Sequence, residues 1–335
     1  MSSASPRHIP VMLNEVLSTA AVNEGDLVVD GTFGNGGYSR AFLEASARVI
    51  GIDRDPSAAQ IAADLDASWP SQFNLVLGQF SQMDLYLQDK QAGLADVVVL
   101  DVGVSSMQID QADRGFSFQK DGPLDMRMSS SGVSAADIVN HYPIKALSDI
   151  LFQLGEERRA PAIARAIDMF RQEKPFTRTL ELAGLIEQVV GRKPRDPIHP
   201  ATRSFQALRI FVNGELLELA RGLGAAERVL KPGGRLIVVT FHSLEDRIVK
   251  RFLTDRSRTH SGGSRYAPEA QLAPPTFTLV SRRAMAASAE EIDQNPRSRS
   301  AKLRAGIRTE AAPRDIDPLQ LSVPKVGTRY PEGDA

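Results

Sequence analysis

The fold is decided by the stretch Leu27-Val28-Val29-Asp30-Gly31-Thr32-Phe33-Gly34-Asn35-Gly36-Gly37-Tyr38-Ser39. A short apolar run ends on an acid and is followed by glycines, and the small residues after them can begin a helix. This order predicts a strand, a loop and a helix N-terminus. Glycines allow the backbone to approach a ligand closely, and the first N–H groups of a helix can bind it. The stretch therefore predicts a ligand-binding turn in an α/β fold.

A second acid indicates what kind of ligand binds there. Arg48–Asp53 is another short apolar run that ends on a carboxylate, about 20 residues downstream, where nucleotide-binding βαβ units place the acid that binds ribose hydroxyls. When G-x-G-x-x-G is aligned from Gly34, Ser39 stands at the third glycine, and Asp30 ends the first strand. Adenosylmethionine suits such a loop better than a pyrophosphate. A nicotinamide dehydrogenase, or merely a tight turn, remains an alternative at this point.

Two further strands extend the pattern at Phe73–Phe80 and Asp96–Asp101. Strands that alternate with helices indicate a mostly parallel sheet covered on both faces. Ligands of such sheets bind beyond the carboxyl ends of the strands. We therefore expect Asp30, Asp53, Phe80 and Asp101 to meet at one crevice.

The α/β pattern is interrupted by helical stretches whose apolar residues repeat at helical spacing. It returns with one long helix from about Arg203 through Val229, a Lys231-Pro232-Gly233-Gly234 turn and a strand at Arg235–Phe241. The sequence predicts a first α/β part at 1–109, an all-α insertion at 110–202, a second α/β part at 203–308 and a disordered tail at 309–335.

Composition narrows the class of protein. The 335-residue chain is 42% hydrophobic, has no cysteine and carries five scattered histidines, so neither disulfides nor a metal site is expected. No apolar run is long enough to span a membrane and residues 1–10 do not resemble a signal peptide, which favours the cytoplasm. Residues 1–130 contain 8 Lys+Arg and 17 Asp+Glu, whereas the remainder contains 32 and 24. The basic half can face phosphates, although ordinary solvation of a surface explains the charge equally well.

Taken together, the motifs resemble one known family, the bacterial small-subunit ribosomal RNA cytosine-N4 methyltransferases. The resemblance covers roughly residues 8 to 308. It rests on His8-x-Pro-Val-Met-Leu13, Asp30-Gly-Thr-Phe-Gly-Asn-Gly-Gly37, Gly51-Ile-Asp-Arg-Asp-Pro56, Asp101-Val-Gly-Val-Ser-Ser106, Arg114-Gly-Phe-Ser-Phe118, Gly122-Pro-Leu-Asp-Met-Arg-Met128, His199-Pro-Ala-Thr-Arg-x-Phe-Gln-Ala-Leu-Arg209, Phe241-His-Ser-Leu-Glu-Asp-Arg247 and Asn295-Pro-Arg-Ser-Arg-Ser-Ala-Lys-Leu-Arg304.

The resemblance implies a Rossmann-like class I methyltransferase whose catalytic domain is formed by a first part at 1–109 and a second part at 203–308, with an inserted helical domain for RNA recognition at 110–202. It implies methylation of the N4 atom of one cytidine in the decoding region of 16S ribosomal RNA, with S-adenosyl-L-methionine as cofactor and the small ribosomal subunit as partner. The family's cofactor contacts fall on Gly36, Gly37, Tyr38, Asp53, Phe80, Asp101 and Gln108. Tyr38 stands where family members often have histidine, which puts a side-chain contact there in doubt but not a backbone contact.

The cytosine N4 atom, which accepts the methyl group, determines what the catalytic residues have to do. The N4 lone pair is conjugated into the ring, so the site has to accept a hydrogen bond from the amino group and align it behind the sulfonium methyl. Asp101 is the first candidate for the catalytic acceptor, with His242 and Asp125 as weaker ones. Phe116 or Phe118 can stack on an extruded base, although core packing is the simpler role. Phosphate contacts are expected from Arg192, Lys193, Arg195, Arg203, Arg297, Arg299, Lys302 and Arg304.

Two alternatives keep part of this interpretation. A methyltransferase of small molecules or proteins would keep the cofactor half and replace the RNA contacts with an enclosed apolar pocket. A catalytically silent RNA-binding protein would need a damaged crevice, and Tyr38 is the only departure in the motif.

Overall fold

The computed structural model describes residues 10–129, 131–192, 198–259, 273–327 and 330. The chain divides into two compact units. The first comprises the described residues of Met1–Gly103 and Leu217–Val323, and the second those of Val104–Leu216 and Pro324–Ala335. Each unit is described by itself below.

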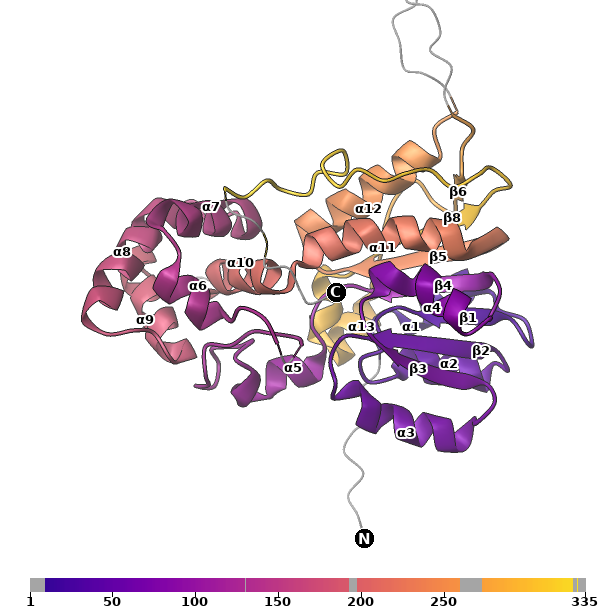
Figure 1. Cartoon of the computed structure of the whole chain (residues 1–335), viewed down its shortest axis with the longest axis horizontal. Coiled ribbons are helices and arrows are strands. Elements are labelled where there is room, and N and C mark those ends of the chain that lie inside the picture. The colour runs from indigo at the N-terminus through magenta and orange to yellow at the C-terminus, as the bar shows by residue number, and fades with distance from the viewer. Residues whose placement is uncertain (1–9, 130, 193–197, 260–272, 328–329, 331–335) are drawn as a thin grey trace, which may run out of the picture. The chain divides into compact units, whose positions relative to one another are not determined.

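The first unit is built on a mixed, mostly parallel sheet (Figure 1). Its strands follow the order β3-β2-β1-β4-β5-β8-β6, and β7 also pairs with β8. The first five strands of that order are mutually parallel, whereas β8 runs antiparallel to its three partners. The strands are β1 (Leu27–Asp30), β2 (Arg48–Asp53), β3 (Phe73–Leu77), β4 (Ala95–Asp101), β5 (Leu230–Thr240), β6 (Phe277–Leu279), β7 (Met285–Ala286) and β8 (Lys302–Arg308).

The central strands are mostly apolar, as expected where helices cover both faces of a sheet. The side chains on one face of the sheet, such as those of Val28, Val99 and Val239, form a core with the helices before and after β1. Alternate residues point to the other face, as expected for a period of two. The helices of this unit are α1 (Leu13–Ala20), α2 (Gly37–Glu44), α3 (Ala58–Ser68), α4 (Met83–Asp89), α11 (Glu215–Val229, which begins in the second unit), α12 (Ser243–Arg256) and α13 (Ala289–Gln294), with the 3₁₀ turns η1 (Phe80–Gln82) and η3 (Pro296–Ser300).

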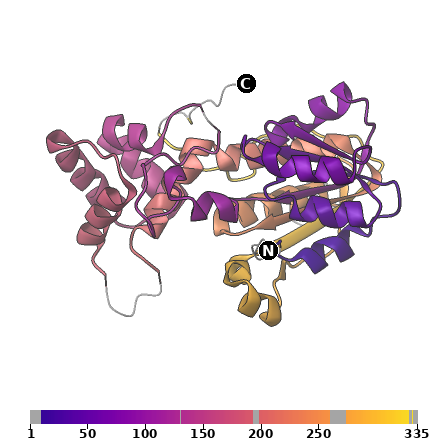
Figure 2. The ribbon, with the colours of Figure 1, turned by 90° about the horizontal axis from the view of Figure 1, so that it is seen from below.

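The second unit is helical, and among its described residues the only β pairing is an isolated bridge between Pro123 and Arg178 (Figure 2). This confirms the α-helical character predicted for this part of the chain. Its elements are α5 (Ser106–Asp110), η2 (Ala112–Arg114), α6 (Ala135–His141), α7 (Ile144–Gly155), α8 (Ala160–Glu173), α9 (Thr179–Val190) and α10 (Thr202–Asn213).

The segment after residue 202 differs from the prediction in two ways. The single helix expected from Arg203 to Val229 is two helices, because Gly214 takes a φ of +60° and ends α10. The helix α10 also belongs to the helical unit instead of the second catalytic part. It packs so closely on α7 that a Cβ atom at Gly155 would lie 2.5 Å from the carbonyl oxygen of Arg203.

The predicted disorder from residue 309 is wrong as far as Val323. The N–H of Thr309 donates to the carbonyl of Thr276 at 2.9 Å, and Arg256 Nη2 donates to the carbonyl of Asp315 at 2.8 Å. Leu321 and Val323 are buried. Isolated apolar residues in a proline-rich segment gave no periodic pattern, so this packing had no signal in the sequence. Of the last residues, 328–329 and 331–335 lie outside the described part.

A separate question is whether the chain crosses a membrane. Across the described residues, no helix is both long and apolar enough to do so.

Candidate active site

The strand order locates a binding crevice in the first unit. Helices and strands follow the sequence outward from β1 in one direction and from β4 in the other, so the order reverses between these two neighbours. In open parallel sheets, ligands bind at such a switch point, beyond the carboxyl ends of the strands. Asp30 ends β1 and Asp101 ends β4. The structure therefore brings these two predicted residues to one place, as expected.

The glycine turn lies between the end of β1 and the start of α2. Gly36 has a φ of +67° and precedes α2, and a Cβ atom there would lie 2.9 Å from Phe33 Cζ. Gly37 begins α2, and a Cβ atom on it would lie 2.3 Å from Pro10 Cγ. The first N–H groups of a helix have no partner within the helix and favour polar or anionic ligand groups. Both glycines are thus required by the backbone path that presents the start of α2.

Asp30 is fully buried and is held from two sides. Its Oδ2 accepts a hydrogen bond from the Ser39 hydroxyl at 2.7 Å, and its Oδ1 accepts one from the Thr32 N–H at 3.3 Å. Burial raises the pKa of Asp30 to about 6, although the bonds from Ser39 and Thr32 act to lower it. The residue that replaces the third glycine of the dinucleotide motif therefore donates to the acid that ends β1.

The carboxyl of Asp101 combines a buried oxygen that has no partner among the described residues with a raised pKa. Its backbone N–H donates to Thr32 Oγ1 at 2.6 Å, but its buried Oδ1 has no hydrogen-bond partner among the described residues. Burial raises the pKa of this carboxyl to about 8, with further contributions from the negative charges of Asp30 and Glu245. Buried polar atoms are rarely left without a partner. Oδ1 of Asp101 is consequently an acceptor that a ligand with an ammonium or sulfonium charge can satisfy.

Asp53 ends β2 and Phe80 follows β3, on the outer side of the switch point. The Asp53 carboxylate accepts hydrogen bonds from the N–H groups of Gly34 at 2.7 Å and Asp55 at 2.8 Å, and burial raises its pKa. A carboxylate has about four acceptor positions, so ribose hydroxyls can still bind. Phe80 is in η1 instead of the predicted third strand, which ends at Leu77. Its ring lies where a Cβ atom on Gly222 of α11 would be only 2.2 Å away.

The side chain of Tyr38 does not serve as a ligand contact. It is buried, and its hydroxyl donates to the carbonyl oxygen of Val11. Burial raises the pKa of this phenol well above its ordinary value, with the charges of nearby carboxylates adding to the effect. Tyr38 therefore ties α2 to the segment before α1, and only its backbone remains a candidate for the cofactor.

His242 follows β5 and faces a buried acid. Its Nε2 lies 2.9 Å from Glu245 Oε1, and Glu245 Oε2 accepts hydrogen bonds from the N–H groups of Phe241 and His242. His242 is the residue that directly precedes α12. Glu245 also acts on the pKa of Asp101, so the dyad belongs to the same electrostatic environment as the end of β4.

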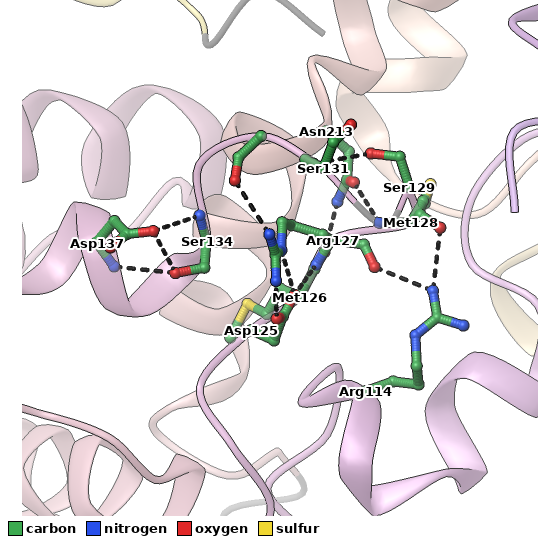
Figure 3. Close-up of polar contacts among 11 residues, drawn as sticks. Arg114, Asp125, Met126, Arg127, Met128, Ser129, Ser131, Ser134, Asp137 and Asn213 are labelled. Carbon is green, nitrogen blue, oxygen red and sulfur yellow. Dashed lines mark hydrogen bonds and ion pairs between the residues drawn. The ribbon is translucent and has the colours of Figure 1, made fainter. Parts of the chain in front are cut away.

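The helical unit holds a tightly bonded loop around the second candidate acid (Figure 3). Asp125 pairs with Arg127 through two contacts, Oδ2 to Nη2 at 2.6 Å and Oδ1 to Nε at 2.9 Å. Burial acts to raise the pKa of Asp125, but the hydrogen bonds and charge of Arg127 outweigh it and lower the pKa. A carboxylate that is stabilised in this way is a weak base. Asp125 is therefore better suited to holding Arg127 than to accepting a proton.

Three further predicted residues in the helical unit have partners inside it. Gln108 is buried and caps α5, because its Oε1 accepts from the N–H of Ser105 at 3.0 Å. The ring of Phe118 packs against His199 and Phe205, with both centroid distances at 4.7 Å. Phe116 is buried next to Arg114. Core packing explains the two phenylalanines without a base.

The predicted phosphate contacts fall into three groups. Arg203, Arg297 and Arg299 are exposed. Arg192 Nη1 lies 3.6 Å from Glu187, Lys302 Nζ lies 3.3 Å from Asp246, and Arg304 is largely buried with Nε 2.7 Å from the same acid. Lys193 and Arg195 lie outside the described residues. Arg304 is therefore a structural partner of Asp246 and a poor candidate for RNA contact.

Comparison with known proteins decides the family. The model of the MraW methylase family matches residues 5–308. The chain belongs to the MraW methylase family. It is accordingly a methyltransferase that uses S-adenosyl-L-methionine. None of the alternatives, dehydrogenase, silent RNA-binding protein or methyltransferase of other substrates, is supported.

Relatives of this MraW methylase match it along nearly its whole length. A protein named Ribosomal RNA small subunit methyltransferase H from Brucella anthropi is 56% identical over 325 residues, which cover 96% of this chain and 93% of the relative. The protein of the same name from Brucella ovis is 56% identical over 326 residues, covering 96% and 94%.

Solved structures resemble the chain only loosely. An rRNA methylase from Streptococcus thermophilus aligns at a TM-score of 0.38 and 10% identity over 91% of this chain and 100% of that one. The N-methyltransferase NodS from Bradyrhizobium japonicum aligns at 0.38 and 11% identity over 89% and 94%. With scores this low, the fold is established by the sheet order given above.

Two residues of the MraW methylase site were not predicted. Thr32 connects β1 to the N–H of Asp101, and Ser39 connects α2 to Asp30. Both stand in the glycine-rich stretch. A residue with a hydroxyl group, placed between the acid that ends a strand and the start of a helix, was the feature of the sequence that could have indicated them.

Proposed function

We propose that this MraW methylase transfers the methyl group of S-adenosyl-L-methionine to N4 of one cytidine in the decoding region of 16S ribosomal RNA. The buried Oδ1 of Asp101 lies at the sheet's switch point and has no hydrogen-bond partner among the described residues, and it carries the proposal on the structural side. The name of the relatives at 56% identity supports ribosomal RNA as the substrate.

When bound, the cofactor supplies an electrophilic methyl group on a sulfonium. The task of the protein is to orient the acceptor, because in-line geometry accounts for much of such a rate enhancement. The carboxyl of Asp101 can accept a hydrogen bond from the N4 amino group and thereby direct the nitrogen lone pair at the methyl. It can alternatively hold the amino acid end of the cofactor, and both roles use the same free Oδ1.

A methylated exocyclic nitrogen has to lose a proton. In our proposal the imidazole of His242 takes it up, because the Glu245 carboxylate 2.9 Å from Nε2 would stabilise the resulting imidazolium. Asp125 is excluded from this role by its pairing with Arg127. Gly36, Gly37, Asp53, Phe80 and Gln108 remain the proposed cofactor contacts, together with the backbone of Tyr38.

We further propose that the substrate is the assembled small subunit, which places the activity in the cytoplasm. The exposed cations Arg203, Arg297 and Arg299 support contact with phosphates outside the target base, as does the half-exposed Lys302.

The test is to incubate the purified chain with labelled cofactor and either naked 16S RNA or small subunits that lack the modification. We expect label in the 16S RNA, located at a single cytidine by nuclease digestion and mass spectrometry, with the subunit as the better substrate. Label on protein or on neither substrate would refute the proposal. His242→Ala should lower kcat and leave the Kd for the cofactor unchanged. An unaltered kcat would remove His242 from proton transfer.

A further inference from the structure

The helix α11 carries a buried acid, Glu218, among apolar side chains of the first unit. Its neighbours Leu219 and Leu223 are fully buried, and only 7% of Glu218 itself is exposed. Burying a carboxylate next to apolar side chains costs free energy unless a partner compensates for the lost water. The contact that Glu218 makes therefore indicates what this acid does.

Glu218 contacts the 3₁₀ turn η1, which follows β3. Its Oε1 accepts a hydrogen bond from the backbone N–H of Ser81 at 2.9 Å, across 137 residues of sequence. The first N–H groups of a helical turn have no acceptor within that turn. Gln79, which stands at the N-cap of η1, makes no side-chain hydrogen bond that would satisfy them. Glu218 thus caps η1 from a different element of the fold.

The same helix leaves space for Phe80, the first residue of η1. Gly222 follows Glu218 by one helical turn and lies on the same side of α11. A Cβ atom at Gly222 would lie 2.2 Å from Cε2 and 2.3 Å from Cδ2 of Phe80. A glycine in a helix interior is less stable than an alanine, and the position of this ring gives a physical reason for the glycine. The backbone of α11 therefore supports the edge of the Phe80 ring.

Phe80 is also held from the direction of β1. A Cβ atom on Gly31, which follows β1, would lie 3.2 Å from Phe80 Cβ. The phenylalanine is nevertheless partly exposed, so it is not enclosed in the core. Nucleic-acid bases stack on the faces of aromatic side chains. An aromatic ring that is fixed and still accessible suits the adenine of the cofactor.

We infer that Glu218 is a positioning residue for cofactor binding. By capping η1 from α11, beside the space left at Gly222, it fixes the ring of Phe80 where the adenine of S-adenosyl-L-methionine stacks on it. The inference rests on the proposed function and adds a residue that acts on the cofactor through another one. Neither Glu218 nor Gly222 belongs to the motifs of the sequence that indicated the cofactor site.

The test measures binding of S-adenosylhomocysteine to the full chain by calorimetry, together with the kinetics of methylation of small subunits. Glu218→Ala should weaken binding about tenfold, as expected when the stacking of one base on an aromatic ring is impaired. KM for S-adenosyl-L-methionine should rise by the same factor, while kcat at saturating cofactor stays unchanged. Glu218→Gln keeps an oxygen acceptor for the Ser81 N–H and should retain the wild-type affinity.

A double-mutant cycle shows whether Glu218 acts through Phe80. Phe80→Ala alone should weaken binding of S-adenosylhomocysteine, and the addition of Glu218→Ala should then change the Kd no further. Gly222→Ala displaces the same ring by a different route and should weaken binding as well. Its control is Gly184→Ala in α9, where a Cβ atom meets nothing within 4 Å.

The matched control for Glu218 is another buried glutamate that accepts a hydrogen bond from a backbone N–H. Glu157 of the helical unit is 5% exposed, and its Oε1 accepts from the N–H of Arg159 at 2.7 Å. Glu157→Ala should lower the thermal denaturation midpoint, as Glu218→Ala does, but leave the Kd for S-adenosylhomocysteine unchanged. An equal loss of affinity in the two variants would attribute the effect to a weakened fold and overturn the inference.

Other outcomes would overturn it as well. An unchanged Kd in Glu218→Ala would do so, and so would the same loss of affinity with and without the Phe80 ring. If Glu218→Ala did not fold, wild-type affinity in Gly222→Ala would be the contradicting result. A wild type that bound no S-adenosylhomocysteine and methylated no RNA would refute the proposed function. A wild type that did both and was matched by Glu218→Ala would refute only the role of Glu218.

Discussion

The Ser39 hydroxyl donates a hydrogen bond of 2.7 Å to Oδ2 of Asp30, and both side chains are fully buried. This contact gives a physical reason for the departure from the dinucleotide motif. A third glycine would allow a close approach of helix and strand, but it would leave the Asp30 carboxyl without this donor. Ser39 therefore stabilises the charged form of an acid in the cofactor crevice, where the pKa is about 6.

Replacing Ser39 with alanine should destabilise the fold in a pH-dependent way. The folded Asp30 carboxyl ionises near pH 6 and an unfolded one near 3.8, so its contribution to stability is lost as the pH rises through this window. Without the Ser39 donor the folded pKa rises further. We expect a loss of about 1–3 kcal/mol in the free energy of unfolding, larger at pH 8 than at pH 5, measured by urea denaturation.

A control for this change is Ser18→Ala, whose exposed hydroxyl donates to the carbonyl of Glu15. Its effect should be small and equal at both pH values. The same ΔΔG at pH 5 and pH 8 for Ser39→Ala would contradict the role assigned to this hydroxyl.

Cofactor binding should release a proton through Asp101. The pKa of this carboxyl is about 8 in the free protein because of burial and the charges of Asp30 and Glu245. A bound cation favours the ionised form and lowers the pKa, so affinity should rise with pH and level off above about 8. Calorimetry at pH 7 in two buffers of different ionisation enthalpy measures the proton release directly. Asp101→Asn should abolish both the release and the pH dependence of Kd, and an unchanged proton count in that variant would place the proton elsewhere.

The glycine turn offers a matched pair of substitutions. Gly25 and Gly36 both have left-handed φ values, +83° and +67°, but a Cβ atom meets nothing within 4 Å at Gly25. Gly25→Ala should therefore cost only backbone strain, about 1–2 kcal/mol. Gly36→Ala should cost about 1–3 kcal/mol more, because Phe33 is buried and packs against Phe73. Thermal denaturation gives both values, and only Gly36→Ala should weaken cofactor binding. Equal costs at the two glycines would mean that Phe33 moves aside freely.

The sheet and its crevice were predictable because their signals are local. Each parallel strand is a short apolar run, and Asp30, Asp53 and Asp101 end their strands in the sequence as they do in the structure. The break at Gly214 was missed because apolar residues continue at helical spacing on both sides of it. A glycine inside a helical pattern is common enough that its left-handed φ could not be assumed.

The pairings of the side chains were not predictable because they join distant segments. Thr32 and the N–H of Asp101 are 69 residues apart, and Asp246 and Arg304 are 58 apart. The basic run around Arg304 contains no acid, so the sequence favoured phosphate contact, whereas the fold places an acid from α12 against it. Only the register of β8 beside β5 makes that ion pair possible.

Asn213 is expected to control the loop of the helical unit that carries Asp125 and Arg127 (Figure 3). Its Oδ1 accepts from the N–H of Met128 at 2.8 Å, and its Nδ2 donates to the carbonyl of Met126 at 2.8 Å. Met126 is buried with a φ of +65°, a conformation that a non-glycine residue keeps only when its surroundings hold it. Asn213→Ala removes the groups that hold it and leaves buried backbone groups unpaired.

We expect Asn213→Ala to lose about 2–3 kcal/mol of stability and to speed hydrogen exchange at the Met128 amide. Methylation of ribosomal RNA should fall, while the Kd for the cofactor stays unchanged because none of the proposed cofactor contacts lies in this loop. Ser129→Ala, which removes an exposed hydroxyl bonded to the carbonyl of Ser131 in the same loop, should change none of these quantities. Unaltered exchange at Met128 in Asn213→Ala would show that the loop keeps its conformation without the asparagine, and the loss of methylation would then need another cause.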